Sequence, residues 1–543
     1  MAILLGTQYL MRRFGPPAEP VPAARTPLKA EKAEAVVQAG PIETAPLPVS
    51  QTSGVQRELV IENRSYRAVL DTRGALLKSF QLKNYKSNSG QPLELIPQIV
   101  PPAASAPLSL QLPEKASVAE RVNRGIYEVR VAGKPVEEAR FTPPTDLTLR
   151  YGEADVQVEK HIRFDSEEYL MEVSAQVWLE GQRQDVMLAL GPDIGTEAGQ
   201  TESDFQGRRI AVSLAGAVQR ETFPKGKSNS FTEPVIWGGF ESKYFAVLAV
   251  APDSFSLLKI NRLDLPYKDA SGKETKIPYY LVYFPVGERP VKLYFGPKDF
   301  EILERARPGL AGVIDYGWFS FIVKPLLLSL KFVHRFVPNW GVSIILLTLL
   351  ISLALFPVRF KQMVSMKKMQ ALQPKLRSIQ DRYKKYKRTD PKRQEMNAEV
   401  MQLYKEHGVN PLGGCLPLVI QMPFLFAFYR MLDGAIELRG APFVFWIQDL
   451  SKMDPYYVTP ILMGGTMVLQ QKLTPQTATD PAQARMMMLM PIVFTAMFFS
   501  LSSGLVVYFL FSNLFSVGFQ KLAEVWMPAD GGAKGKKAKR AKE

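Results

Sequence analysis

The chain has 543 residues, of which 46% are hydrophobic and 22% are charged, so it exceeds one typical domain and is not a disordered chain. One cysteine and three scattered histidines exclude a disulfide framework and any metal-ligand spacing. The net charge of +15 is concentrated beside long apolar segments, which favours membrane topology over DNA recognition. We therefore expect no metal, no cofactor and no specific DNA partner.

The N-terminal residues are apolar but few. Residues 1–11 form an apolar run that ends at Arg12 and Arg13, whereas a helix needs about 20 residues to cross a bilayer. We interpret residues 1–15 as an N-terminal membrane anchor, either the tail of a longer anchor that begins upstream or a degenerate signal segment. Residues 16–56 are rich in Pro, Ala and Glu without an apolar period, which predicts a flexible linker.

Residues 57–300 carry a period-two pattern, which is typical of strands with one buried face. Turns rich in Gly, Pro and Asp separate the alternating stretches, so we expect an all-β sandwich. The alternating hydrophobic residues are Val156, Val158, Ile162 and Phe164, then Met171, Val173, Ala175, Val177 and Leu179, and finally Val291, Leu293 and Phe295.

The second half of the chain is predicted to be a membrane region. Between Asp315 and Val337, large apolar residues surround basic ones such as Lys324 and Lys331, which predicts an amphipathic helix in the membrane interface; we assign it to residues 301–338. An α-helical core of five spans follows and is assigned to residues 339–525. The candidate spans are residues 340–358, 412–432, 456–473, 486–501 and 505–522, the last two joined through residues 502–504.

Basic residues set the predicted orientation. They crowd residues 359–408, after the first span, and the tail at residues 526–543, so both face the cytoplasm; the acidic residues 433–455 and the β domain then face the other side. Within 359–408, apolar residues recur at helical spacing after Pro374, which suits a first helical position, and residues 389–391 predict a turn. We expect an antiparallel helical hairpin there, which is either a solvated lever or a dock for anionic lipids or a ribosome.

The motifs of common catalytic sites are absent. No GxxxxGK[ST] loop, HExxH helix or GxSxG elbow occurs, and no paired acids lie in an apolar span, so we expect neither an enzyme nor an ATP-driven pump. The spans hold scattered polar residues instead, including Thr348 and Ser352 on one helix face. Such residues either join helices or line a hydrated cavity, and prolines that free backbone carbonyls favour the cavity. These prolines are Pro417, Pro423, Pro460 and Pro491.

These segments resemble the YidC membrane insertases, including the family's large periplasmic β-supersandwich. The resemblance implies a multi-pass protein of the bacterial inner membrane, with a periplasmic β domain and a cytoplasmic C-terminus. It rests on DTRGA from Asp71, WGGFESKYF from Trp237, NWGVSI from Asn339, LQPKL from Leu372, NPLGGCLPLVIQMP from Asn410, DPYYVTPILMGGTM from Asp454 and SSGLVVYFLFSN from Ser502.

The resemblance implies a protein that accepts nascent membrane proteins in a hydrated groove, alone or beside the Sec translocon. Their apolar segments then leave sideways into the lipid bilayer, driven by apolar burial and without a nucleotide. Two other classes stay open, a lipid scramblase and a small-solute transporter that use the same groove.

The resemblance also assigns residues, and the chain departs from the family at one of them. Members usually carry an arginine at the position of Ser352, where it is thought to attract acidic substrate tails. Serine costs less to hold in a span than arginine, whose insertion costs about 2.5–3.5 kcal/mol. Arg359 and Lys361, about two turns nearer the cytoplasm, would supply a shallower positive field. The predicted groove residues are Thr348, Ser352, Gln421, Tyr508, Ser512 and Asn513, and none is catalytic.

Overall fold

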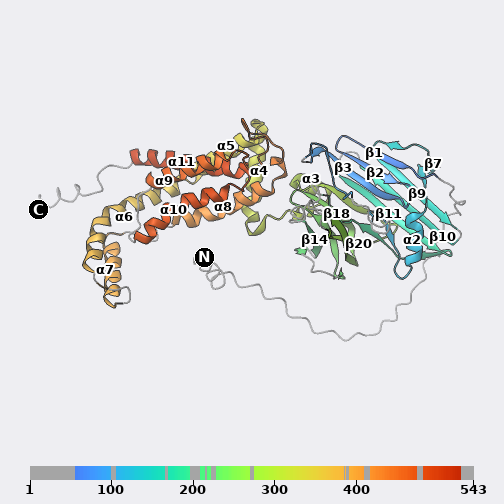
Figure 1. Cartoon of the computed structure of the whole chain (residues 1–543), viewed down its shortest axis with the longest axis horizontal. Coiled ribbons are helices and arrows are strands. Elements are labelled where there is room, and N and C mark those ends of the chain that lie inside the picture. Colours follow the sequence, from blue (N-terminus) through green and yellow to red (C-terminus); the bar gives the residue numbers. More distant parts are fainter. Residues whose placement is uncertain are drawn as a thin grey trace. The chain divides into compact units, whose positions relative to one another are not determined.

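Figure 1 shows the computed structural model of the chain, in which strands come first and helices follow. The predicted anchor, nearly all of the predicted linker and the basic tail beyond Trp526 lie outside the described residues. The structure describes residues 55–526 except 88, 99–105, 154, 166–168, 196–207, 215–216, 222–227, 269–273, 385, 387–389, 409–415 and 474–480.

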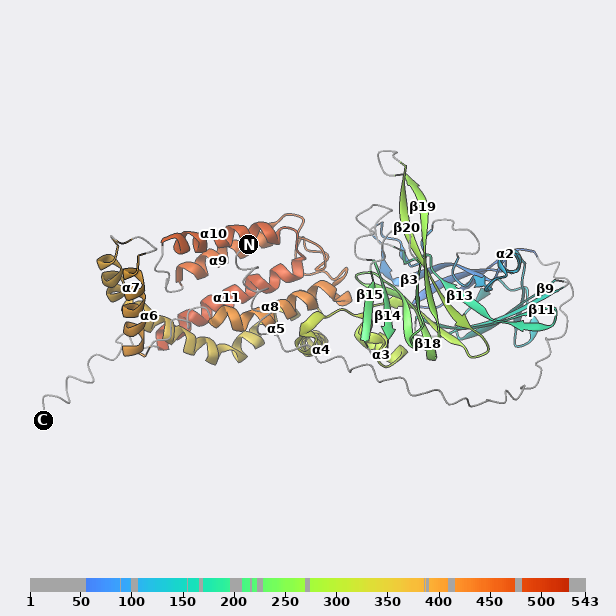
Figure 2. The ribbon, with the colours of Figure 1, turned by 90° about the horizontal axis from the view of Figure 1, so that it is seen from below.

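The β domain has three sheets, one large hydrophobic core and a smaller cluster that includes Met187 and Leu281. The eleven-stranded sheet has the order β15-β14-β17-β18-β21-β11-β10-β9-β6-β7, with β12 paired to β11; the two five-stranded sheets have the orders β4-β3-β2-β1-β8 and β16-β19-β20-β13-β5. Figure 2 shows β19 and β20 as a long hairpin that projects from the domain. The strands are β1 (Glu58–Glu62), β2 (Tyr66–Asp71), β3 (Leu76–Lys86), β4 (Pro92–Glu94), β5 (Leu110–Gln111), β6 (Glu128–Val131), β7 (Lys134–Pro135), β8 (Arg140–Phe141), β9 (Thr145–Glu153), β10 (Val156–Phe164), β11 (Leu170–Leu179), β12 (Gln182–Gln184), β13 (Val186–Leu190), β14 (Arg209–Leu214), β15 (Ala217–Glu221), β16 (Asn229–Phe231), β17 (Val235–Glu241), β18 (Phe245–Phe255), β19 (Leu258–Lys268), β20 (Glu274–Val286) and β21 (Val291–Pro297).

The period-two prediction is confirmed along β10 and for most of β11. Val173, Ala175 and Val177 are buried, and the polar residues between them are partly exposed. The prediction is wrong at the end of β11, where Trp178 is buried and Leu179 is partly exposed. At this end β11 pairs with a further strand, β12, in which Arg183 lies opposite Trp178.

Lys160 occupies an inward position of β10 and is fully buried, which the hydrophobic pattern did not predict. Its ammonium group donates to the carbonyl oxygens of Gly74 at 2.8 Å, Ala75 at 3.3 Å and Leu108 at 2.8 Å, so each of its three N–H groups has an acceptor. Burial lowers the pKa of Lys160 to about 7. Gly74 is required in this turn because its φ is 75° and a Cβ would lie 2.2 Å from the carbonyl oxygen of Asn123.

The helices of the second half share a separate hydrophobic core, to which α4, α5, α8, α9, α10 and α11 contribute. The prediction that a helix begins at Pro374 is wrong, because Pro374 lies inside α6, which begins at Phe356. Helix α6 is bent by 58° from α5. Pro357 instead takes the first turn of α6, where a missing N–H costs nothing. The helices are α2 (Ala116–Arg124), α3 (Phe300–Ala306), η3 (Leu310–Val313), η4 (Gly317–Phe319), α4 (Ser320–Phe336), α5 (Trp340–Ala354), α6 (Phe356–Arg382), α7 (Lys392–Glu406), α8 (Leu416–Gly434), η6 (Ile436–Leu438), α9 (Val458–Leu473), α10 (Pro481–Phe498) and α11 (Ser503–Trp526).

Length and composition single out few of these helices as membrane spans. Among the described residues, α11 is long and apolar enough over residues 503–525, and α5 with α6 passes the same test if the bent pair is one span. Residues 488–498 of α10 form a shorter apolar stretch. Helices α8 and α9 overlap two further predicted spans, so the number of five spans stays a prediction.

Helix α4 has an apolar face on both sides. Val323 and Leu330 are buried in the helical core, whereas Phe321, Phe332 and Phe336 are exposed along the other side. Trp318, just before α4, is 86% exposed. A helix of a soluble domain would present a polar outer face, so this surface is typical of a helix that contacts lipid.

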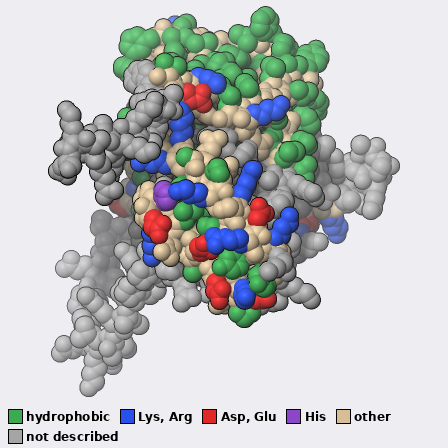
Figure 3. All heavy atoms as spheres, turned by 90° about the vertical axis from the view of Figure 1, so that its left-hand side faces the viewer, with side chains coloured by type: hydrophobic (Ala, Val, Ile, Leu, Met, Phe, Trp, Pro, Cys, Tyr) green, Lys and Arg blue, Asp and Glu red, His purple; other side chains and the backbone are tan. Residues whose placement is uncertain are grey.

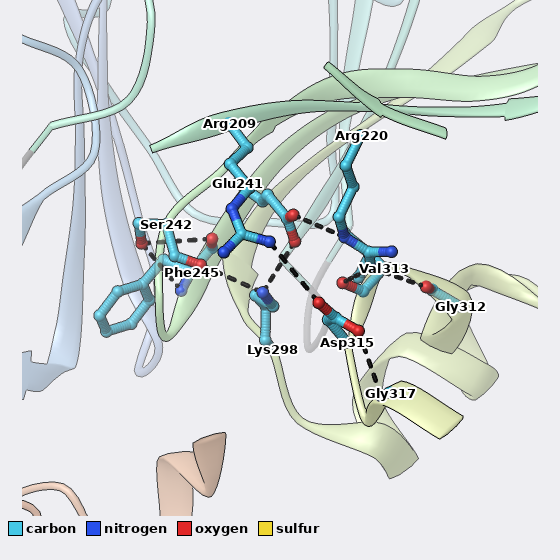
Figure 4. A network of polar contacts seen from close by, with 10 residues as sticks. All are labelled: Arg209, Arg220, Glu241, Ser242, Phe245, Lys298, Gly312, Val313, Asp315 and Gly317. Carbon is cyan, nitrogen blue, oxygen red and sulfur yellow. Dashed lines mark hydrogen bonds and ion pairs between the residues drawn. The ribbon is translucent and has the colours of Figure 1, made fainter. Parts of the chain in front are cut away.

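A buried polar network fastens the chain between β21 and α4 to the β domain (Figure 4). Glu241 at the end of β17 accepts hydrogen bonds from Lys298 Nζ and Arg220 Nε, both at 2.8 Å. Arg220 also donates to the carbonyl oxygen of Val313 at 2.8 Å, and Arg209 pairs with Asp315 at 3.5 Å. Burial lowers the pKa of Lys298, and Glu241 opposes this shift. The residues that lead into α4 are therefore held by charges of the sheet as well as by Leu303, Leu310 and Val313, which are buried in the core of the β domain.

A second group of charges joins α4 to the start of α3 and to η6. Lys331 on α4 lies 2.8 Å from a carboxylate oxygen of Glu437 and 3.1 Å from one of Asp299. Asp299 is also the N-cap of α3, since its other oxygen accepts from the backbone N–H of Glu301 at 2.8 Å. All three charged side chains of this group are at least 85% buried.

Candidate functional site

Helices α5 and α11 lie side by side, and residues near their starts are at matching heights along the two helix axes. A Cβ on Gly504 would lie 3.6 Å from Ile344 near the start of both helices, and beyond the end of α5 the ring of Phe356, the first residue of α6, lies 5.3 Å from that of Phe519. Both helices rise by about 1.5 Å per residue, so residues one turn after Ile344 and Gly504 are at nearly the same level. Thr348 is therefore level with Tyr508.

Thr348 and Ser352 project from one face of α5 into the helical core and are only 2% and 3% exposed. The hydroxyl of Thr348 donates to the carbonyl oxygen of Ile344 at 2.6 Å, one turn earlier in the same helix. This back-bond satisfies the hydroxyl without a partner from another helix. The polar groups are thus present in the helical core, where neighbouring helices cover them.

Tyr508 is the aromatic centre of the site. Its ring stacks on Phe428 of α8 at 4.1 Å with an angle of 10° between the planes, and it meets Phe509 edge-on at 5.2 Å. Ser512, one turn further along α11, is also buried, and the side chain of Asn513 donates to Thr466 of α9 at 3.4 Å. Helix α11 therefore contacts α8 and α9 through its aromatic and polar residues.

The two predicted positive charges, Arg359 and Lys361, have different surroundings. Arg359, near the start of α6, donates to the hydroxyl of Ser516 on α11 at 2.8 Å, whereas Lys361 is exposed. Ser516 was not predicted as a site residue, although it continues the four-residue spacing of Tyr508 and Ser512 along α11. The arginine therefore lies at the end of the polar row and not within it.

Part of the predicted site lies outside the description. The side chain of Gln421 is among the residues that are not described, although its backbone belongs to α8. Of the four prolines, Pro423 and Pro491 lie inside helices, while Pro460 stands in the first turn of α9, where no hydrogen bond is lost. Pro417 is likewise near the start of α8. Only Pro423 and Pro491 therefore free backbone carbonyls inside a helix, as the predicted hydrated cavity requires.

Charged side chains gather at the end of the helical region formed by α6 and α7, next to a broad hydrophobic surface (Figure 3). The two helices contact each other through an ion pair between Arg382 and Glu399 and through Met369, Leu372 and Tyr404. In the described part of the chain, no three His, Cys, Asp or Glu side chains are grouped so that they could hold a metal ion.

A β domain fused to apolar helices with a row of polar side chains inside is the architecture of a membrane protein. Two family models match, the "YidC periplasmic domain" at residues 58–329 and the "60Kd inner membrane protein" at residues 332–530. The chain belongs to the YidC family of membrane protein insertases.

Individual relatives agree with this assignment. The chain is 37% identical over 550 residues to the membrane protein insertase YidC of Syntrophus aciditrophicus, with 96% of each chain covered. It is 36% identical over 479 residues to that of a Geobacter species, covering 86% of this chain and 85% of the relative. A crystal structure of an active YidC insertase matches at 18% identity with a TM-score of 0.35, over 90% of this chain and 96% of the other.

The family settles several predictions. The resemblance to YidC is confirmed, and so is the expectation that the protein is not an enzyme, since its relatives are named as insertases. A family with a periplasmic domain and an inner-membrane domain also confirms the inner membrane as its location. The roles of individual groove residues stay predictions.

Proposed function

We propose that the chain receives hydrophobic segments of nascent membrane proteins beside α5 and α11 and releases them sideways into the lipid. The observation that supports this most directly is the pair of polar rows at matched levels, Thr348 and Ser352 on α5 and Tyr508 and Ser512 on α11. Polar groups at membrane depth lower the cost of moving the polar flank of a substrate, while burial of its apolar segment drives insertion.

The burial of these groups defines a closed state. Thr348, Ser352 and Tyr508 are each less than 5% exposed, so a substrate reaches them only after neighbouring helices separate. Helix α8 is the element to move, because the stack of Phe428 on Tyr508 closes the row from that side. The incoming apolar segment would replace this aromatic contact with its own.

The positive charge of the site is displaced toward the α6–α7 end. Ser352 stands where relatives usually carry arginine, and Arg359 bonds to Ser516 about two turns away. An acidic substrate tail would therefore meet the cation at the entrance, before it reaches the buried row. Lys361, which is exposed, would add to the same field.

The proposed topology has five spans, with the β domain periplasmic and the α6–α7 hairpin and C-terminus cytoplasmic. The hairpin and tail would then meet the ribosome, and the membrane face of the core would meet the Sec translocon. The basic composition of both segments supports this orientation, because positive residues accumulate on the cytoplasmic side. The exposed aromatic face of α4 would rest in the periplasmic leaflet.

Insertion of a single-span substrate into liposomes that contain only the purified full-length protein tests the proposal, scored by protease protection. Thr348→Val removes a hydroxyl from the proposed row, and Thr495→Val is its matched control, because Thr495 on α10 makes the same back-bond, to Pro491 at 2.7 Å. We expect protection above that of empty liposomes, slower insertion by Thr348→Val and an unchanged rate for Thr495→Val. No gain by the folded wild-type protein would contradict autonomous insertion, and equal effects of the two variants would contradict the row.

A further inference from the structure

An exposed arginine lies near the end of α8, beside the short turn η4. Arg430 is the one basic residue in the sequence of α8, which is otherwise mostly apolar between Leu416 and Gly434. A Cβ on Gly317 would lie 3.9 Å from Arg430 Nε, so the side chain of this arginine contacts η4. Arg430 is not among the proposed groove residues and is a separate feature of the molecule.

The carboxylates on either side of Arg430 are engaged by other basic residues. Asp433, one turn further along α8, lies 2.7 Å from Lys243 Nζ. Asp315, just before η4, pairs with Arg209 at 3.5 Å (Figure 4). Within the part of the chain that the structure describes, the guanidinium group of Arg430 has no ion pair and no hydrogen bond. Its five N–H groups are therefore open to solvent or to an anionic ligand.

The position of Arg430 is not explained by membrane orientation. It lies near the end of α8 that leads into η6, and Lys331 joins η6 to the start of α3 through Glu437 and Asp299. This end of α8 is therefore on the side of the domain that the family places in the periplasm. Basic residues of membrane proteins accumulate on the opposite, cytoplasmic side. A cation on this side without a carboxylate points to a local anion.

The surroundings of this arginine are those of a membrane interface. Trp318 in η4 is 86% exposed, and Phe321 in the first turn of α4 is 72% exposed. The rings of Phe319 and Phe426 stack at 6.1 Å with an angle of 3° between the planes, which fixes η4 against α8. An exposed tryptophan beside apolar helices is typical of the headgroup level of a bilayer. A ligand here thus meets a cation and an indole N–H next to a lipid-facing apolar surface.

We propose that Arg430 and Trp318 bind the phosphate group of a phospholipid from the leaflet on the side of the β domain. The planar guanidinium group would donate two parallel hydrogen bonds to the phosphate oxygens, and the indole N–H would donate a third. The acyl chains would lie along Phe321 and Leu328, which are exposed two turns apart on one face of α4. This apolar face distinguishes a lipid from free phosphate, which would gain nothing from it.

The test is native mass spectrometry of the full-length, delipidated protein in detergent, titrated with phosphatidylglycerol. Arg430→Gln should weaken the tightest lipid site about fivefold, the factor expected for the loss of one cation near an anionic headgroup. Arg430→Lys keeps the charge but not the planar pair of donors, so its affinity should lie between those of Arg430→Gln and the wild type. The matched control is Arg73→Gln, an exposed arginine of the β domain, which should leave lipid binding unchanged.

A further variant separates a lipid from a soluble anion. Phe321→Ser removes apolar surface that only acyl chains would contact, so it should weaken phosphatidylglycerol and leave the affinity for inorganic phosphate unchanged. Displacement of the lipid by an equal concentration of inorganic phosphate would show that the position selects a soluble anion and would overturn the proposal.

Equal lipid affinity of Arg430→Gln and the wild type, at equal melting temperature, would remove Arg430 from any lipid site. If Arg430→Gln fails to fold, Phe321→Ser decides, since an unchanged lipid affinity in that variant would equally overturn the proposal.

Discussion

The ammonium of Lys331 lies 2.8 Å from the carboxylate of Glu437, and this ion pair joins helix α4 to the 3₁₀ turn η6. Both side chains are almost covered, so the pair lies in a medium where charges interact strongly and where an unpaired charge is costly. Asp299 adds a second carboxylate at 3.1 Å and connects the pair to the N-cap of α3. The orientation of α4 relative to the start of α3 therefore depends on charges.

The first prediction concerns this pair. Lys331→Met leaves two carboxylates next to each other without a cation and should lower the free energy of unfolding by about 3 kcal/mol. Burial already raises the pKa of Glu437, so the variant should recover part of this loss at acidic pH, where the carboxyl is protonated. Thermal melts of the detergent-solubilised chain measure the effect. Lys324→Met, an exposed lysine on the same helix, should be nearly neutral, and an equal loss for both variants would contradict the account.

The second prediction concerns the network of Figure 4. Glu241→Gln leaves Lys298 buried without its counter-charge and should destabilise the β domain by about 3–5 kcal/mol. It should also speed proteolysis of residues 307–317, which Arg220 holds through the carbonyl oxygens of Gly312 and Val313. Glu288→Gln breaks an exposed pair with Arg183 and should change stability by about 0–1 kcal/mol. Unchanged proteolysis in Glu241→Gln would show that the network does not hold this segment.

The third prediction concerns the position of the groove charge. Arg359→Gln should slow insertion of substrates with acidic outer tails about fivefold, as for the loss of one charge at a membrane surface. Ser352→Ala should slow them at most about threefold, because it removes no more than one hydrogen bond within the membrane. Protease protection in liposomes measures both rates, with a neutral-tailed substrate as the reference. A strong loss in Ser352→Ala alone would place the critical polar group at Ser352.

The fourth prediction separates the two roles of Tyr508. Tyr508→Phe keeps the ring that stacks on Phe428 and should cost about 1 kcal/mol of stability or less. Tyr508→Ala removes the ring and should cost about 3–5 kcal/mol. Slower insertion by Tyr508→Phe at an unchanged melting temperature would assign a substrate contact to the hydroxyl. Insertion that falls only in the alanine variant would leave Tyr508 as a packing residue.

The fifth prediction concerns Lys160 and pH. Burial lowers its pKa from 10.5 to about 7 in the folded chain, so between these values the unfolded chain binds more protons than the folded one. The stability of the β domain should therefore rise as the pH is raised from 7 toward 10.5, and the contribution is lost as the pH falls through 7. Lys160→Met should flatten this dependence and leave three carbonyl oxygens without a donor, at a cost of about 1–3 kcal/mol for each one that stays unpaired.

Thermal melts between pH 6 and pH 10 in about unit steps follow this dependence through the strand signal in circular dichroism. Lys83→Met is the control, because Lys83 forms an exposed pair with Glu62 and should change neither the melting temperature nor its slope with pH. A slope that persists in Lys160→Met would assign the pH dependence to other groups.

The hydrophobic pattern determined the order of the two regions and the buried faces of β10 and most of β11, and the resemblance of sequence motifs to a known family indicated the family. Hydrophobic spacing reports directly which face of a strand is buried, so Val173 and Val177 were predictable one residue at a time. The polar residues of α5 and α11 were found because polar groups stand out in apolar segments. Their partners were not, since Phe428 and Ser516 look like ordinary residues of their own helices.

Only the tertiary structure decided which charges are buried together. Lys160, Lys298 and Lys331 resemble surface lysines in sequence, because a charge can be buried only if acceptors from distant segments reach it. Those acceptors come from Leu108, Glu241 and Glu437, which lie 52, 57 and 106 residues away along the chain. No local pattern encodes such separations, because they arise when the sheets and helices pack.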